Sequence, residues 1–375
     1  LEAAVHARRL DPRRRDGQPR GSGQMAWGQL DFGRQEVISE FLDPRNNFQP
    51  VSIRSEIRFD PLTHNTCRIA HFSSGTAPEE PYDHLQRLEA GRPCPFCPEL
   101  VEKATPRFPT DFYSGGRIHR GEATLFPNLS PYDRFSAISV ISAKHIVPLT
   151  AFSVAQLRDA FGVALEYLAI VARITKPPMF DTVSWNYLPE AGSSVVHPHL
   201  QVLSTEQPTN QHRLELEDAR TYHFHRGISY WDDLAEEEHR RGERWIGEIG
   251  SISWLTAYAP FSPLFDVLAL FRGRSAFSEL QPGDLEDFAD GLQRVFRYMS
   301  GRGLAAFNLG FYTAPFPMPE FTLYARLSPR TTINARLGTS DMNSLRLIYD
   351  EPFAVEYPEE VAAQLRPSFA SGSSA

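Results

Sequence analysis

The sequence predicts an α+β fold in which one unit occurs twice, with antiparallel sheets and flanking helices. Residues 124–173 contain two apolar strand-like segments, joined by a turn rich in Pro and aromatic residues, and then an amphipathic helical pattern. Residues 253–300 repeat this order. Each copy is followed by a further pair of strand-like segments, at 180–204 and at 305–329. Such an internal repeat indicates a duplicated structural unit.

Both predicted helices have a regular apolar stripe. In the first copy, apolar residues recur at steps of three and four after Ser153, a residue type that often caps a helix. In the second copy a similar series runs from Leu285 to Met299. We expect each stripe to pack against a sheet as part of the core.

The two ends of the chain differ from its centre. Residues 1–24 are rich in Arg, Pro and Gly and lack an apolar period, so we expect a disordered or added extension before Met25, a plausible natural start. Residues 367–375 are expected to form a flexible tail. Between them we expect a first half at 50–205 and a second half at 206–366.

The composition is that of a globular protein with a sizeable core. Of the 375 residues, 41% are hydrophobic and 22% are charged. No segment approaches the roughly 18 apolar residues of a membrane helix, and the N-terminus lacks the apolar core of a signal peptide. We therefore expect a cytoplasmic protein with no membrane partner. The formal net charge of −8 argues against a nucleic-acid partner.

The segment AGSSVVHPHLQVLS at 191–204 sets His197, His199 and Gln201 at alternating positions. In an extended strand these three side chains share one face, and the apolar residues between them share the other. A half-exposed strand that happens to be rich in histidine is the alternative interpretation. The surrounding motifs must decide between a structural strand and a functional site.

Two of the three cysteines form the motif CPFC, as Cys94 and Cys97. Three cysteines cannot make a disulfide framework, and a C-x-x-C spacing suits either a metal or a redox pair. The βαβ context typical of the redox use is missing from the predicted elements, which favours a metal.

Several motifs together resemble the galactose-1-phosphate uridylyltransferases, a double-unit family of the histidine triad superfamily. In order they are RFDPLT, CPFC, FPNLSPY, KHIVPL, AGSSVVHPHLQ and NLGFYTAPF. The likeness runs from about Arg54 to about Arg366 and covers most of the chain. It implies two histidine-triad-like units, of which the second is degenerate. Since only the first unit keeps the histidines, we expect one active site per chain.

The resemblance implies a covalent mechanism. His199 matches the nucleophile that attacks the α-phosphorus of a nucleotide and forms a nucleotidyl-histidine, while a nearby main-chain carbonyl holds its second ring nitrogen. Gln201 matches a glutamine that can donate to a phosphate oxygen without supplying a proton to the leaving group, which favours transfer over hydrolysis.

Further residues are assigned to nucleotide and phosphate binding by the same resemblance. A turn before the histidines and an asparagine would hold the phosphates, and a second asparagine would frame the base. The residues are Asn128, Asn186, Ser193, Ser194, Arg58 and Arg68. The turn could equally be an ordinary connecting loop, and either arginine could be a solvated surface residue.

A structural zinc ion, one per chain, is the implied cofactor. The family pairs the two cysteines of CPFC with two histidines, and the closed set here would be Cys94, Cys97, His145 and His197. Many members hold a second metal with a glutamate and three histidines of the second half. Those histidine positions are Tyr312, Tyr324 and Arg326 here, so we expect the second metal site to be absent.

The expected activity is nucleotidyl transfer by ping-pong exchange between a nucleoside diphosphate sugar, or a similar nucleotide, and a phosphorylated acceptor. The residues after Arg330 do not reproduce the family's hexose contacts, so the acceptor stays open. A dinucleoside polyphosphate phosphorylase or hydrolase is the alternative enzyme, and a non-catalytic nucleotide-binding protein is a third hypothesis. The resemblance also implies a homodimer.

Overall fold

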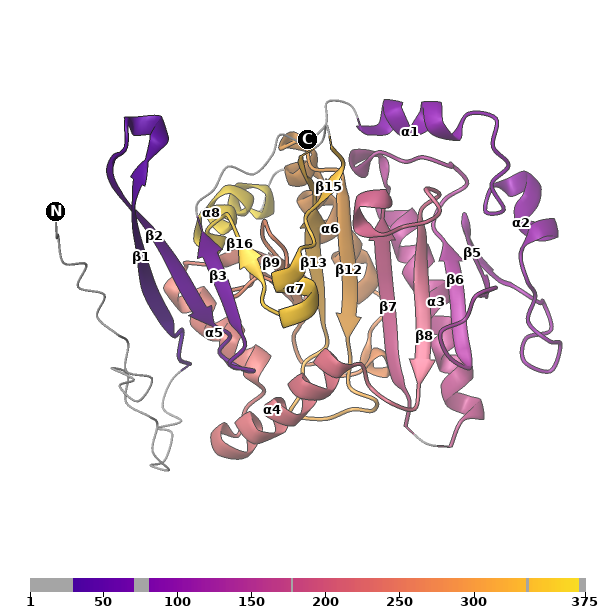
Figure 1. The fold of residues 1–375 in the computed structure, drawn as a ribbon. Coiled ribbons are helices and arrows are strands. Elements are labelled where there is room, and N and C mark those ends of the chain that lie inside the picture. Colours follow the sequence, from indigo (N-terminus) through magenta and orange to yellow (C-terminus); the bar gives the residue numbers. More distant parts are fainter. Residues whose placement is uncertain (1–29, 71–80, 177, 335–336, 371–375) are drawn as a thin grey trace.

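A ten-stranded antiparallel sheet forms the centre of the computed structural model, which describes residues 30–70, 81–176, 178–334 and 337–370 (Figure 1). In the order of the sheet, its strands are β4 (Ile118–Arg120), β5 (Ala123–Pro127), β6 (Phe135–Val140), β8 (His199–Thr205), β7 (Phe180–Tyr187), β12 (Ala306–Tyr312), β13 (Tyr324–Arg330), β11 (Val267–Phe271), β10 (Ile252–Thr256) and β9 (Trp245–Ile249). The extension predicted at 1–24 lies outside the described residues.

The two halves of this sheet repeat one arrangement. The first half runs β5, β6, helix α3 (Val154–Ile174), β7 and β8, and the second runs β10, β11, helix α6 (Asp284–Gly301), β12 and β13. They join where β7 pairs with β12, so one sheet continues through both copies. The predicted α+β fold with a duplicated unit is therefore confirmed.

Both long helices pack on one face of the sheet. Ser153 and Gln156 form a reciprocal capping box that starts α3, as the cap signal predicts. The apolar stripes of α3 and α6 are buried against core side chains of the strands. Contact between α6 and the sheet is so close at Gly291 that a Cβ atom there would lie 2.0 Å from the ring of Trp254. The two helices thus cover one face of the sheet, and a functional site is expected on the opposite face.

The second half is covered on its other face as well. Helices α4 (Asn210–Arg226) and α5 (Tyr230–Arg241) pack there through a separate apolar cluster that includes Trp231, Leu255 and Leu268. In the first half, the corresponding face of β5 and β6 contacts only a short segment around Phe96 and helix α2 (Pro98–Ala104) among the described residues. The polar face of β7 and β8 therefore stays accessible.

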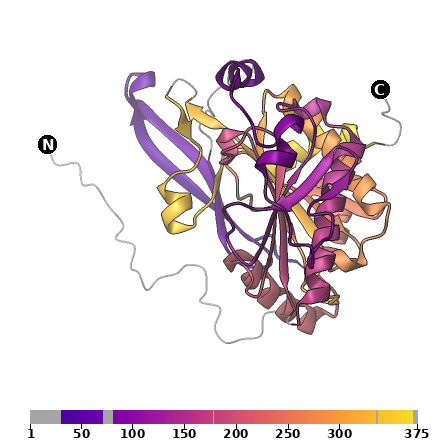
Figure 2. The ribbon, with the colours of Figure 1, turned by 90° about the vertical axis from the view of Figure 1, so that its right-hand side faces the viewer.

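A small sheet joins the two ends of the described chain. It contains β1 (Arg34–Asp43), β2 (Gln49–Phe59), β3 (Thr66–Ala70) and β16 (Phe353–Ala354), and β16 runs parallel to β3. Figure 2 shows the β1–β2 hairpin and helix α7 (Ser344–Tyr349) on the side of the large sheet away from α3 and α6. The remaining elements are α1 (Pro81–Glu89), β14 (Thr332–Asn334), β15 (Thr339–Ser340), α8 (Pro358–Phe369) and four short 3-10 turns.

The C-terminal helix corrects one boundary. We expected a flexible tail from residue 367, but α8 continues through Phe369, whose ring packs on that of Trp254 with the centroids 5.5 Å apart. This aromatic contact holds the last turn in the core, and residues 371–375 lie outside the described part. Within the described residues, no helix is both long and apolar enough to cross a membrane.

Candidate active site and metal centre

The four predicted metal ligands come together from three separate segments. Cys94 and Cys97 lie in the turn before α2, His145 follows β6, and His197 lies just before β8. One ligand atom from each residue lies within 4.8 Å of the others. Segments up to 103 residues apart in the chain are therefore gathered around one point.

The distances between these atoms fit a tetrahedral metal. The sulfur-to-Nδ1 separations are 3.8 Å for Cys94 and His197, 3.6 Å for Cys97 and His197, and 3.7 Å for Cys97 and His145. A zinc ion about 2.3 Å from sulfur and about 2.0 Å from nitrogen would place those atoms about 3.5 Å apart. The donor set and its spacing thus suit a structural divalent metal.

Second partners orient the two histidines. The Nε2 atom of His197 donates to the main-chain carbonyl of Ser142 at 2.7 Å, which leaves Nδ1 as the ligand atom. The Nε2 atom of His145 lies 3.6 Å from a carboxylate oxygen of Glu89. Burial lowers the pKa of His197 to about 4, so its imidazole is neutral, and burial raises the pKa of the Cys97 thiol to about 11. A bound metal cation would stabilise the deprotonated form of the Cys97 thiol.

His199 is the first residue of β8 and is 7% exposed. Its Nδ1 lies 2.8 Å from the main-chain carbonyl oxygen of His197, to which an Nδ1 proton donates. The proton stays on Nδ1, and the Nε2 lone pair is available for attack. Desolvation lowers the pKa of His199, which also favours the neutral ring. His197 was expected to share an extended strand with His199 and Gln201, but the strand begins only at His199, because His197 lies in the turn that faces the metal ligands.

Phe96 connects the metal loop to this histidine. It lies between the two cysteines, and its ring packs edge-on against that of His199, with the centroids 5.2 Å apart. It also contacts Phe126 of β5, at 5.6 Å between centroids. The sequence analysis did not identify Phe96, although its place inside C-x-x-C was a usable signal. The metal loop therefore fixes one wall of the site.

The polar face continues from β8 across the sheet. Gln201 pairs with Ser184 of β7, and Asn186 of β7 pairs with Asn308 of β12. The Nδ2 atom of Asn308 donates to Oδ1 of Asn186 at 2.7 Å and to the carbonyl of Ala191 at 2.9 Å. Since Oδ1 of Asn186 is used in this way, its Nδ2 amide is the group offered to a ligand. Asn308 was not predicted, although its place in the second copy of the strand was a signal.

The turn before the histidines has the small, polar character expected of it. Gly192 has a φ of 85°, which favours glycine, and Ser193 donates its hydroxyl to the carbonyl of Val195 at 2.7 Å. Ser194 is exposed. The hydroxyl of Ser193 thus shapes the turn, while Ser194 is exposed in the turn before β8.

Three other predicted binding residues lie elsewhere. The side chain of Asn128 is engaged with Ser136 and with the main chain of Ser130, in the β5–β6 connection. Arg58 is buried in the small sheet and paired with Glu359. Arg68 lies on β3 and pairs with Glu351. Both arginines lie in the small sheet and not on the strands that carry His199 and Asn186. Carboxylates of the C-terminal segment bind both side chains there.

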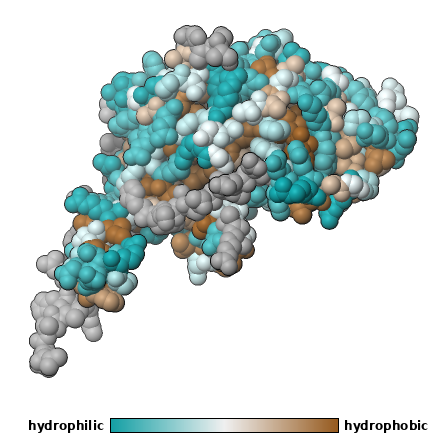
Figure 3. All heavy atoms as spheres, turned by 90° about the horizontal axis from the view of Figure 1, so that it is seen from above, coloured by the Kyte–Doolittle hydropathy of each residue, from teal (hydrophilic) through white to brown (hydrophobic). Residues whose placement is uncertain are grey.

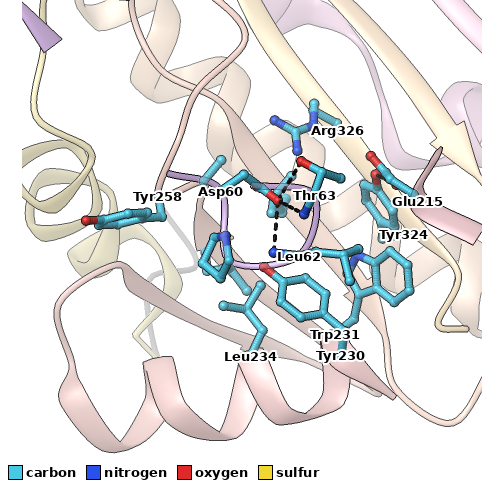
Figure 4. A pocket seen from close by; sticks show the side chains of 14 residues that line it. Asp60, Leu62, Thr63, Glu215, Tyr230, Trp231, Leu234, Tyr258, Tyr324 and Arg326 are labelled. Carbon is cyan, nitrogen blue, oxygen red and sulfur yellow. Dashed lines mark hydrogen bonds between the residues drawn. The ribbon is translucent and has the colours of Figure 1, made fainter. Parts of the chain in front are cut away.

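The three positions at which the resemblance implies histidines of a second metal site lie in a buried hydrogen-bonded group. Tyr324 donates to Glu215 of α4 at 2.5 Å and stacks on Tyr312, with the ring centroids 4.7 Å apart. Arg326 donates to the buried Asp266 at 2.7 Å. Figure 4 shows Glu215 and Tyr324 beside each other, with Arg326 near the turn of Asp60 and Thr63 around a small cavity of about 30 Å³. Two phenols and a guanidinium, those of Tyr312, Tyr324 and Arg326, thus stand where the second metal site would need imidazole ligands.

Comparisons with known proteins agree with this fold. No family model matches the sequence. An uncharacterized protein from Archaeoglobus fulgidus is 32% identical over 312 residues, which are 83% of this chain and 91% of that protein.

Solved structures are similar in fold at low sequence identity. A GalT-like protein from Arabidopsis thaliana and an ADP-glucose phosphorylase from Arabidopsis thaliana with bound ADP-glucose each superpose with a TM-score of 0.63 and 16% identity, over 83% of this chain and 98% of theirs. A uridylyltransferase superposes with a TM-score of 0.61 and 17% identity, over 84% of this chain and 98% of its own. The chain belongs to one family with the archaeal protein and has the duplicated histidine-triad fold of the galactose-1-phosphate uridylyltransferase-like proteins.

Proposed function

We propose that the protein is a nucleotidyltransferase that works through a covalent nucleotidyl-histidine on His199. One observation carries this proposal: the contact from Nδ1 of His199 to the carbonyl of His197, at 2.8 Å, which leaves Nε2 as a buried, neutral nucleophile. A ring held in this way can attack phosphorus without first losing a proton.

The first step forms a bond from Nε2 to the α-phosphorus and breaks the bond to the bridging oxygen, which leaves with its electron pair on a sugar phosphate. The ring then carries positive charge, which the carbonyl of His197 stabilises through the Nδ1 proton. In the second step a phosphate oxygen of the acceptor attacks, the phosphorus–nitrogen bond breaks, and Nε2 recovers its electron pair. In this proposal Gln201 and Asn186, on neighbouring strands, donate to the phosphate oxygens that gain charge.

A nucleoside diphosphate sugar is the proposed donor. The similar Arabidopsis phosphorylase holds ADP-glucose, which supports a nucleotide sugar as the class of substrate. The roles predicted for Ser193 and Ser194 stay part of this proposal, since their turn precedes the nucleophile directly.

Zinc is the proposed metal, one ion per chain, bound by the two cysteines and two histidines. When bound, it ties the CPFC loop to the strand of the nucleophile and takes no part in the transfer. A second metal is not proposed, because Arg326 would place its positive charge beside any divalent ion among Tyr312 and Tyr324.

A homodimer is the proposed assembly. The β1–β2 hairpin and α7 lie on the same side of the molecule, and Figure 3 shows apolar surface on the arm that projects from the body. Their exposed apolar side chains are Ile38, Phe41, Leu42, Phe48, Leu345, Leu347, Ile348 and Tyr349. Such a surface is typical of an interface, and a second copy of the chain is the partner proposed here. Light scattering of the wild type and of Leu347→Lys tests this assembly.

The proposed activity is tested by intact-protein mass measurement after mixing with ADP-glucose or UDP-glucose. We expect an increase equal to one nucleoside monophosphate in the wild type and in His84→Ala, which changes an exposed histidine of α1. His199→Ala should give no adduct. Adding inorganic phosphate, a hexose 1-phosphate or water alone then identifies the acceptor by loss of the adduct. Turnover without any adduct on His199 would mean that the acceptor attacks the nucleotide directly.

A further inference from the structure

A cleft of about 380 Å³ lies beside the nucleophile strand, over β7, β12 and β13. Its floor includes Ser184, Asn186 and Asn308, the polar residues that continue the face of His199. Three arginines line it, and its lining residues include no carboxylate: they are Arg326, Arg330 and Arg346. A volume of this size suits a small organic molecule, and the arginines favour an anionic one.

The strand register relates this cleft to the site around His199. Ser184 pairs with Gln201 on one side and with Gly310 on the other, and Gly310 pairs with Arg326. The two halves meet symmetrically at β7 and β12, so Arg326 and Ser328 of β13 occupy the places that His199 and Gln201 occupy in β8. The cleft is thus the counterpart, in the second half, of the nucleotide face in the first.

Arg326 gives this second half-site a guanidinium group, paired with Asp266, that cannot act as a nucleophile. Its side chain is 11% exposed, its Nη1 donates to Asp266, and its guanidinium carbon lies 3.9 Å from the ring centroid of Phe261. Its buried Nε atom has no hydrogen-bond partner among the described residues. A buried donor without a partner is costly, and a ligand in the cleft would supply one.

Arg330 and Arg346 lie at the same cleft. Arg330 donates to Oδ1 of Asn308 at 2.7 Å and is paired with Asp341. Because Asn308 also donates to Asn186, a continuous chain of hydrogen bonds leads from Arg330 to the strand beside the nucleophile. Arg346 of α7 has a side chain that is 25% exposed and pairs with the exposed Asp350. Its guanidinium can therefore turn to a ligand at little cost.

We propose that this cleft is a second ligand site, which binds a phosphate-bearing small molecule through Arg326, Arg330 and Arg346. Each of the three arginines pairs with one carboxylate outside the lining, and its remaining N–H groups match the several oxygens of a phosphate group. Apolar side chains such as Pro263 and Met342 contact the rest of the ligand. Strands lie about 4.8 Å apart, so β13 lies about 14 Å from β8, and a phosphate bound at β13 is separate from the site of nucleotidyl transfer. A phosphate held there cannot attack the α-phosphorus on His199, so this ligand is distinct from the attacking acceptor of the proposed transfer reaction.

Calorimetric titration of the full chain with inorganic pyrophosphate tests the site. We expect Arg346→Gln to weaken binding about tenfold or more, as for loss of a charge-assisted contact. Arg297→Gln is the matched control, because Arg297 is an exposed arginine of α6 on the opposite face of the sheet. The affinity of this variant for pyrophosphate should equal that of the wild type. Gln201→Ala reports on the nucleotide face: a larger loss of affinity there than in Arg346→Gln would place the anion beside His199 and overturn the proposal.

A second variant tests whether weaker binding could result from local misfolding. Arg330→Gln combined with Asp341→Asn removes the cation without leaving the buried Asp341 unpaired, and it should also weaken pyrophosphate binding. Wild-type affinity in both arginine variants, or no binding to the wild type, would overturn the site. Adduct formation on His199 of the wild type is measured separately. Pyrophosphate binding does not require it, so a missing adduct with arginine-dependent binding would refute the proposed function and leave the cleft site standing.

Discussion

Phe96 and His199 pack edge to face, with their ring centroids 5.2 Å apart and their planes at 68°. Phe96 lies between the two cysteines of the metal centre, so the loop that would wrap a metal also supports the imidazole of the nucleophile. The position of the His199 ring therefore depends on two contacts: the carbonyl of His197 and the ring of Phe96.

The first prediction follows from this contact. Phe96→Ala should slow adduct formation on His199 by about tenfold, because a ring displaced by a small distance loses its line of attack. Phe96→Leu should recover part of the rate, and metal content should stay near that of the wild type. Rapid quenching and metal analysis of the same samples measure both. Phe224→Ala, at an exposed phenylalanine of α4, is the control. An unchanged rate in Phe96→Ala would show that the loop does not support the nucleophile.

The second prediction concerns the metal. Cys97→Ser should lose the bound ion and lower the free energy of unfolding by about 2 kcal/mol or more, since a ligand that holds two distant segments together is removed. The comparison is Cys67→Ala, which changes a buried cysteine outside the metal group. Elemental analysis and thermal unfolding are the measurements. A wild type purified gently, fully folded and free of metal would contradict the assignment.

The third prediction addresses the bridge between the halves. Asn308→Ala should slow adduct formation by about tenfold, because Asn186 loses the donor that fixes its side chain. Asn65→Ala, at an exposed asparagine near β3, should have no effect. Rates of adduct formation at saturating nucleotide sugar decide the matter. If Asn308→Ala matches the wild type, the second half does not orient the phosphate-binding amide.

The fourth prediction is a dependence of stability on pH. Burial raises the pKa of Glu215 to about 7 from its ordinary 4.5. Between these values the folded chain keeps a proton that the unfolded chain releases, so the contribution of Glu215 to the free energy of unfolding falls as pH rises from 4.5 to 7. In Glu215→Gln this contribution is absent. Denaturant titrations of both proteins should therefore show that the free energy of unfolding of the variant increases relative to that of the wild type as pH rises from 4.5 to 7. A difference that stays constant over this window would show that Glu215 is ionised throughout.

The sequence predicted those parts of the site that are local in the chain. The C-x-x-C spacing, the alternation of His199 and Gln201, and the repeated helix pattern depend on residues within one or two turns or strands, and the structure contains each of them. The prediction that His197 shares this strand was wrong, because His197 lies before β8 and faces the metal ligands, and the alternation of residue types does not indicate such a turn.

Other features depend on pairings that local patterns do not encode. Arg58 was a candidate for phosphate binding, but its guanidinium is bound by Glu359, 301 residues later in the chain. The chain from Arg330 through Asn308 to Asn186 exists because the β7–β12 and β12–β13 registers bring these residues into line. Register is fixed by which face is buried, and several registers were compatible with the sequence.

The pairing of β16 with β3 has a consequence for synthesis of the chain. The small sheet needs Phe353 to lie beside Arg68, and the ion pair of Arg58 with Glu359 spans 301 residues. Contacts so distant in sequence form late, because a long loop must close before they are gained. During synthesis β1, β2 and β3 are therefore made long before β16, the edge partner of β3, and Glu359, the partner of Arg58, are available. Chaperone dependence during translation should fall on this N-terminal segment rather than on the repeated units.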